Sequence, residues 1–139
     1  MGKILCATRG GEASYRTQDV AIQLAKERGQ ELIFLYVVDV GFLDMTASPI
    51  VIDVETSVER MGEFLLAMAQ ERAREQGLEV QVVVREGKTR EEIKAAVKEL
   101  EVDTVVLGRP AEGGVFQEES IRAFAREIEE ETGAKVVLV

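Results

Sequence analysis

The sequence predicts an α/β fold, a doubly wound parallel sheet of five strands with four helices distributed over both of its faces. Five short runs rich in Val, Ile and Leu alternate along the chain with four segments of helical periodicity. Several of the apolar runs are nearly continuous, which is typical of strands buried on both sides of a parallel sheet. Strict alternation also requires helical crossovers, and these place helices on both faces.

The apolar runs give the positions of the strands. We expect strands at Lys3–Thr8, Glu31–Val38, Glu79–Val84, Thr104–Leu107 and Lys135–Val139. With the first strand in the centre, the strand order is 3-2-1-4-5. No linker or change of composition interrupts the 139 residues, so residues 1–139 are predicted to form a single domain.

The first two helices are each expected to end at a glycine, Gly29 and Gly77. The apolar face of the first consists of Val20, Ala21, Leu24 and Ala25. The second is expected to begin at Thr56, which stands at capping-box spacing from Glu59. Its apolar face consists of Val58, Met61, Leu65, Met68 and Ala69. The pattern therefore predicts that Met61 and Met68 are core residues.

The last two helices show the same devices. Thr89 and Glu92 repeat the capping-box spacing, and Gly133 ends the fourth helix. The predicted buried stripes are Ile93, Ala96, Val97 and Leu100 in the third helix and Ile121, Phe124, Ala125 and Ile128 in the fourth. The segment Asp39–Glu55 is long for a loop and partly apolar. It either covers a pocket or a partner or is buried against its own chain.

Composition excludes several classes of function. The net charge of −9 argues against nucleic acid or an anionic membrane as a partner, because both need a basic surface. No apolar run approaches the roughly 20 residues of a membrane span, and the N-terminus lacks a signal-peptide pattern. The absence of histidine excludes a Ser-His-Asp triad, a Cys-His pair and a histidine-bound zinc ion.

The numbers of cysteine and asparagine residues indicate the cellular compartment and the source of the protein. The single cysteine excludes an internal disulfide and suits a reducing compartment, so we expect a cytoplasmic protein. Cys6 lies within the first strand and is predicted to be buried there. Asparagine is absent while Glu and Arg are abundant, which favours a thermophilic source.

The strand order also predicts where a ligand would bind. In a doubly wound sheet, ligands bind at the carboxyl ends of the strands where the strand order reverses, here between the first and fourth strands. The two loops that leave these strands read "TRGGEAS" and "GRPAEGG", and each contains a glycine pair. A crevice is expected between them.

Three stretches together resemble the universal stress protein family. They are "KILCATRGGEASYRTQDVAIQLAKERGQELIFLYVVD", "VVVREGKTREEIKAAVKELEVDTVVLG" and "GAKVVLV", in an order and at spacings that span nearly the whole chain. The resemblance implies the adenine nucleotide alpha hydrolase-like fold and a homodimer paired through the last strand. The residues of that strand are Lys135, Val136, Val137, Leu138 and Val139.

The ATP-binding branch of the family has two motifs, and the chain departs from both. Where that branch has "A-x-D-G-S" after the first strand, the chain reads "ATRGGEAS", which puts Arg9 in place of the aspartate. In the motif G-x2-G-x9-G followed by Ser or Thr, counted from Gly108, the second glycine falls at Ala111. If two residues are deleted from the loop, Ser120 takes the hydroxyl position. Gly113 and Gly114 match a later glycine pair of the family.

The loop chemistry works against a triphosphate. Pro110 removes an amide donor, and Ala111 lacks the conformational freedom of glycine. Glu118 and Glu119, expected at the start of the last helix, suit the helix dipole but repel phosphate. The resemblance therefore implies a family member without the standard ATP-binding motif.

Three functions remain open at this point. The first is a non-enzymatic stress-response or regulatory protein that is homodimeric and acts on protein partners. The alternative is a protein that binds ATP or AMP through the altered loop, with Arg9 supplying charge; otherwise Arg9 pairs with a carboxylate such as Asp39. An enzyme, for instance a slow nucleotide hydrolase, is least favoured, because no acid–base pair or metal cluster is identifiable. The crevice residues for a nucleotide are Ala7, Thr8, Arg9, Gly10, Val38, Asp39, Gly108, Gly113, Gly114 and Ser120.

Overall fold

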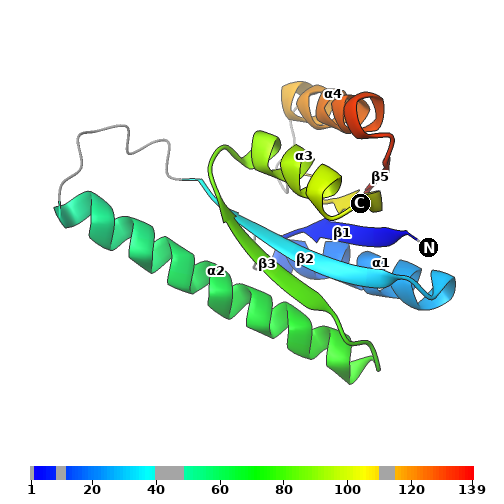
Figure 1. The fold of residues 1–139 in the computed structure, drawn as a ribbon, viewed down its shortest axis with the longest axis horizontal. Coiled ribbons are helices and arrows are strands. Elements are labelled where there is room, and N and C mark those ends of the chain that lie inside the picture. Colours follow the sequence, from blue (N-terminus) through cyan, green and yellow to red (C-terminus); the bar gives the residue numbers. More distant parts are fainter. Residues whose placement is uncertain (1, 9–11, 40–48, 110–114) are drawn as a thin grey trace.

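The computed structural model describes residues 2–8, 12–39, 49–109 and 115–139. It contains a five-stranded parallel sheet of order β3-β2-β1-β4-β5 with four helices, which confirms the predicted fold (Figure 1). The elements are β1 (Lys3–Ala7), α1 (Glu12–Arg28), β2 (Glu31–Val38), α2 (Pro49–Glu75), β3 (Gln81–Glu86), α3 (Thr89–Glu99), β4 (Val102–Leu107), α4 (Val115–Thr132) and β5 (Lys135–Leu138).

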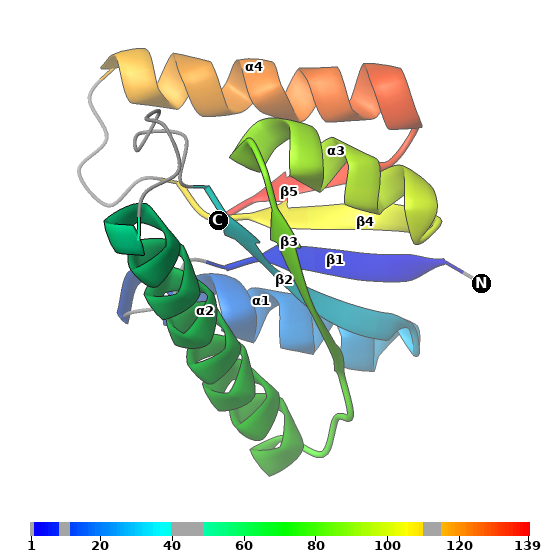
Figure 2. The ribbon, with the colours of Figure 1, turned by 60° about the vertical axis from the view of Figure 1, so that its left-hand side comes forward.

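The helices form two layers, with α1 and α2 on one face of the sheet and α3 and α4 on the other (Figure 2). Successive residues of β1 point to opposite faces, so Leu5 packs in the cluster under α3 and α4. Ile4 and Cys6 pack in the cluster under α1 and α2. Complete burial raises the pKa of the Cys6 thiol to about 12, which agrees with its predicted place in the core.

The predicted stripes of α1, α3 and α4 are confirmed. Among their members, Ala21, Ala25, Ile93, Ala96, Val97, Ile121, Phe124, Ala125 and Ile128 are buried. Val20, Leu24 and Leu100 are partly buried and pack against the same clusters. These helices bury the residues that their periodicity indicates.

The prediction for α2 was wrong in its buried face. Met61 and Met68 are 58% and 40% exposed, and Phe64 is 65% exposed. The buried residues of α2 include Ala69, which was predicted, and Leu66 and Ala73, which were not part of the predicted face. Gly62 explains the rotation, because a Cβ atom at this position would lie 2.4 Å from Cδ1 of Tyr36 in β2. The helix packs against the sheet through Gly62, Ala69 and Ala73 together with Leu66, whereas Met61, Phe64 and Met68 are exposed.

The start of α2 differs from the prediction, whereas that of α4 agrees with it. Helix α2 begins at Pro49 rather than at Thr56, so the second part of the predicted loop is helical. Proline is well suited to the first turn of a helix, but the apolar run that follows has no periodicity to indicate one. Helix α4 begins at Val115, so Glu118 lies in its first turn. Residues 40–48, the rest of that loop, lie outside the described part of the chain.

The predicted capping box of α3 does not form. The N-cap residue is Lys88, and its side chain makes no capping hydrogen bond. Thr89 is the first residue of the helix, and Glu92 pairs with Arg85 of β3 at 2.9 Å. The cap comes from a different element, as described below.

The last strand, β5, lies at an edge of the sheet, as predicted. Its backbone is nevertheless contacted by side chains of the same chain. The Glu129 carboxylate accepts a hydrogen bond from the N–H of Val136 at 3.3 Å, and the Arg109 guanidinium donates one to the carbonyl of Leu138 at 3.4 Å. The edge is therefore partly protected. Within the described residues, no helix is long and apolar enough to cross a membrane.

Candidate ligand cleft

A cleft of about 430 Å³ lies at the carboxyl ends of β1, β2 and β4, where the strand order reverses. Helices α3 and α4 form one wall of it, through Thr89, Arg90, Ile93, Ile121 and Phe124. The volume falls within the range of small-molecule sites in proteins. The position is the one that the strand order predicts for a ligand.

The floor of the cleft is built from the ends of β1 and β4. The buried Thr8 donates its backbone N–H to the carbonyl of Leu35 at 2.9 Å, and its hydroxyl accepts a hydrogen bond from the Gln18 amide at 3.0 Å. Gly108 lies so close to α1 that a Cβ atom would be 2.6 Å from the Thr17 hydroxyl oxygen. Glycine at 108 is thus explained by packing between β4 and α1 without any ligand.

Asp39, directly after β2, holds the start of α3. One of its carboxylate oxygens accepts hydrogen bonds from the backbone N–H of Thr89 at 3.1 Å and from the Thr89 hydroxyl at 3.0 Å. A negative charge at this place also interacts favourably with the helix dipole. Asp39 therefore supplies the cap that the neighbouring Lys88 lacks.

Arg90, the second residue of α3, reaches across the cleft wall to α4. Its Nη2 atom donates a hydrogen bond to the hydroxyl of Ser120, and its guanidinium carbon lies 5.1 Å from the centre of the Phe124 ring. The sequence analysis did not identify this residue. A signal was present, because a cation in the first turn of a helix opposes the helix dipole and is better explained by a contact elsewhere.

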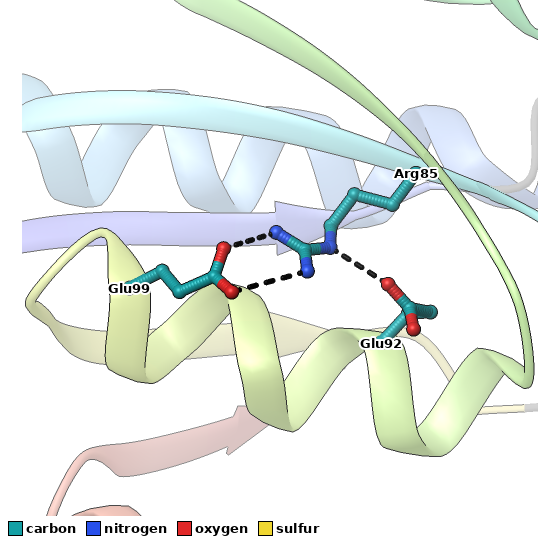
Figure 3. A network of polar contacts seen from close by, with 3 residues as sticks. All are labelled: Arg85, Glu92 and Glu99. Atoms are coloured by element: carbon teal, nitrogen blue, oxygen red, sulfur yellow. Dashed lines mark hydrogen bonds and ion pairs between the residues drawn. The ribbon is translucent and has the colours of Figure 1, made fainter.

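Ion pairs fix α3 in place on two sides. Arg85 of β3 bonds Glu92 at 2.9 Å and Glu99 at 2.6 Å, both on α3 (Figure 3). The hydrogen bond from Arg85 lowers the pKa of Glu99. Lys94 pairs with Glu131 of α4 at 3.1 Å, and this bond raises the pKa of Lys94. Side-chain pairs therefore hold α3 both to β3 and to α4.

Glu118 in the first turn of α4 is paired with two arginines. Arg109 and Arg122 each lie 3.0 Å from its carboxylate. Hydrogen bonds from Arg109 and then Arg122 lower the pKa of Glu118. Its negative charge is thus balanced by the two guanidinium groups.

A family profile described as the Universal stress protein family matches residues 1–117. The chain belongs to the universal stress protein family. It is 27% identical to the universal stress protein YxiE of Bacillus subtilis over 114 residues, which cover 76% of this chain and 77% of that protein.

Solved structures of universal stress proteins share the fold. The protein UspA from Lactobacillus plantarum superposes with a TM-score of 0.81 at 16% identity, covering 99% of this chain and 97% of that one. A universal stress protein family member from Arabidopsis thaliana with AMP bound gives a TM-score of 0.69 at 16% identity, covering 100% and 91%.

The structure of this universal stress protein brings part of the expected crevice together. Ala7, Thr8, Asp39 and Gly108 all line the cleft. Ser120 is bonded to the lining residue Arg90, whereas the buried Val38 is not a lining residue, although Val37 is. The other expected residues, Arg9, Gly10, Gly113 and Gly114, lie outside the described part of the chain. The same is true of Pro110 and Ala111.

Proposed function

We propose that this universal stress protein is a non-enzymatic regulatory protein whose cleft binds an adenine nucleotide through an altered loop, without the standard ATP-binding motif. The observation that carries the proposal is the cleft of about 430 Å³ at the switch point of the sheet. Solved structures of family members hold cAMP, dAMP or AMP, which supports an adenine nucleotide as the ligand class.

The lining combines apolar side chains, which suit a base, with polar groups, which suit a sugar phosphate. Apolar side chains come from both the sheet and the helices, namely Leu35, Val37, Ile93, Leu107, Ile121 and Phe124. Polar groups come from Thr8, Thr89 and Arg90. Mostly apolar walls with a few placed polar groups are typical of cofactor and ligand sites.

The non-enzymatic part of the proposal rests on the ionisable groups. The chain has no histidine to act as an acid or base near neutral pH. Among the described lining residues the only carboxylate is Asp39, which accepts two hydrogen bonds from Thr89 and thereby positions α3. Within the described residues, no cluster of acidic or cysteine side chains is arranged to hold a metal ion.

Calorimetric titration with AMP, ADP and magnesium ATP tests the proposal, together with native mass spectrometry for co-purified nucleotide. We expect binding of adenine nucleotide without turnover. Replacing the lining residue Ala7 by Leu narrows the cleft and should lower the affinity by roughly tenfold or more, since overpacking costs about 1–3 kcal/mol. The matched control, Ala67→Leu on the exposed side of α2, should bind as the wild type does. Equal affinity of the two variants would place the ligand elsewhere.

A second candidate is a regulator that binds no nucleotide and acts on protein partners alone. The hydrogen bond between Arg90 and Ser120 favours it, because one donor of the lining residue Arg90 is already used within the protein. Absence of heat with all three nucleotides, and of co-purified ligand, would support this candidate over the first.

We further propose that the protein is a homodimer paired through β5. The edge position of β5 supports this, although Glu129 and Arg109 contact its backbone. The N–H of Val139 points to β4, where Leu107 accepts it at 2.9 Å, and alternation along the strand turns the N–H of Leu138 to the free edge. Leu138→Pro removes this edge donor while sparing the pairing with β4. Sedimentation should show a dimer for the wild type and for Leu138→Val, and a monomer for Leu138→Pro. A wild-type monomer would refute the pairing.

A further inference from the structure

We propose that Arg90 is the residue that determines the anionic specificity of the cleft, and that it selects a nucleotide with a single phosphate group. The inference rests on the proposed nucleotide-binding function and adds the residue and the ligand class to it. It concerns a side chain of α3, outside both of the loops that the sequence singled out.

The guanidinium of Arg90 is oriented by the α4 wall. Its Nη2 atom is bonded to the Ser120 hydroxyl, and the group lies against the ring of Phe124 at 5.1 Å. In such a contact the flat face of the guanidinium lies against the aromatic ring. Its N–H groups lie in the guanidinium plane and remain available as donors. An arginine held in this way is suited to bidentate binding of a phosphate.

Arg90 also differs from the neighbouring arginines in its partners. Arg85, Arg109 and Arg122 are each paired with a glutamate at 3.0 Å or less. Arg90 has no carboxylate within ion-pair distance among the described residues. Its charge is therefore not neutralised by a described acidic side chain, and it is the only cation among the described lining residues of the cleft.

Ser120 adds a second group at the same point. Because its oxygen accepts the hydrogen bond from Arg90, its own hydroxyl hydrogen can be donated to a phosphate oxygen. The two side chains thus present donors to one anionic group. Arg90 comes from the first turn of α3, and Ser120 comes from α4. The ion pair between Lys94 and Glu131 holds these two helices together.

The charges around this point favour one phosphate over three. A single guanidinium offers one cationic contact, which one phosphate group can use, and the other charged residue among the described lining residues, Asp39, is negative. The neighbouring arginines are occupied by Glu118, and the exposed Glu119 follows directly after it. The additional phosphate groups of a triphosphate would therefore find no further cation among the described lining residues.

Calorimetric titrations of the full chain with adenosine, AMP and magnesium ATP separate this inference from the function on which it rests. We expect AMP to bind about 10- to 100-fold more tightly than adenosine, because one charge-assisted hydrogen bond contributes an affinity gain of this size. We also expect AMP to bind more tightly than magnesium ATP. Arg90→Gln should bring AMP to the affinity of adenosine and leave adenosine unchanged. Arg90→Lys should restore part of the difference, because it keeps the charge but not the fork. Raising the salt concentration should reduce the difference in the wild type.

Arg122→Gln is the matched control, since it removes an exposed arginine of α4 that does not line the cleft. It should leave the ratio of AMP to adenosine affinity unchanged, and circular dichroism should show that all variants are folded. If the wild type binds AMP and adenosine equally, or if Arg90→Gln keeps the ratio, the inference is wrong while nucleotide binding stands. Tighter binding of magnesium ATP than of AMP would overturn the single-phosphate selectivity. If neither adenosine nor any nucleotide binds, the proposed function itself fails.

Discussion

On the face of the sheet covered by α3 and α4, the helices bury their largest apolar residues, whereas on the opposite face α2 packs through some of its smallest. Ile93, Phe124 and Ile128 are buried in the core between the sheet and these two helices. In the second layer the contact of α2 is made by Gly62, Ala69 and Ala73 together with Leu66. The two faces of the sheet are thus covered by different kinds of helix contact.

The difference shows what hydrophobic periodicity measures. A stripe of large apolar residues locates the buried face of a helix when large side chains fill the space between the helix and the sheet. When a glycine allows a close approach, the contact is made by the small residues, and the large ones can face outward. The apolar stripes in the sequence therefore predicted the buried faces of α3 and α4 correctly. For α2 they predicted a face that includes the exposed Met61 and Met68.

The largest expected effects compare core residues of the two faces with an exposed residue of α2. Leu66→Ala and Ile128→Ala each remove a buried side chain and should lower the free energy of unfolding by about 2–5 kcal/mol. Phe64→Ala, at an exposed position, should change it by less than about 0.5 kcal/mol. Urea unfolding of the three variants is the measurement. A loss for Phe64→Ala equal to that for Leu66→Ala would mean that α2 packs through its large residues after all, or that Phe64 is covered in an assembly.

A smaller effect is expected at the close contact itself. Gly62→Ala places a Cβ atom against the ring of Tyr36, and the forced shift should destabilise the protein by about 1–3 kcal/mol. In a Tyr36→Ala background the same substitution should cost less, because the obstructing ring is gone. A double-mutant cycle by urea unfolding checks this coupling. Additive effects of the two substitutions would show that another contact determines the position of α2.

The face covered by α3 should be the more sensitive to acid. The hydrogen bond from Arg85 holds the pKa of Glu99 below its ordinary value of 4.5. Its contribution to stability is therefore present above about pH 4.5 and is lost as the pH falls through the lower value in the folded protein. Thermal melting of the wild type and of Glu99→Gln should differ at pH 7 and converge in acid. A difference that is constant with pH would contradict a contribution from the charged pair.

The smallest effect concerns Cys6 beneath α1 and α2. Burial raises the pKa of its thiol to about 12, so the thiolate is scarce at pH 8 and reagents cannot reach it in the folded protein. Labelling by a maleimide should be slow in the native state and fast in urea. Rapid labelling of the folded protein would indicate that this face opens locally.

Local patterns were sufficient for most of the fold. The apolar runs predicted every strand of the sheet to within a few residues, and the glycines after α1, α2 and α4 marked where these helices end. The order of strands followed from the alternation together with the family resemblance, and the site was located at the switch point. These features depend on neighbours in the sequence or on general rules of sheet topology.

The contacts within the cleft could not be predicted in this way. Asp39 caps a helix that begins 50 residues later, and Arg90 bonds a serine 30 residues away. The capping box predicted from Thr89 and Glu92 was wrong, because the carboxylate of Asp39, from another part of the chain, caps the helix. A residue pair so distant in sequence leaves no periodic signal.

The sequence by itself determined the class of the fold, the faces of three helices, the place of the cleft and the chemistry that a chain without histidine excludes. Only the tertiary structure decided the rotation of α2, the partner of Asp39 and the place of Arg90 in the cleft wall. The reason is physical. Hydrophobic periodicity and turn preferences act within a few residues, whereas steric contact and hydrogen bonding between elements depend on distances that packing alone determines.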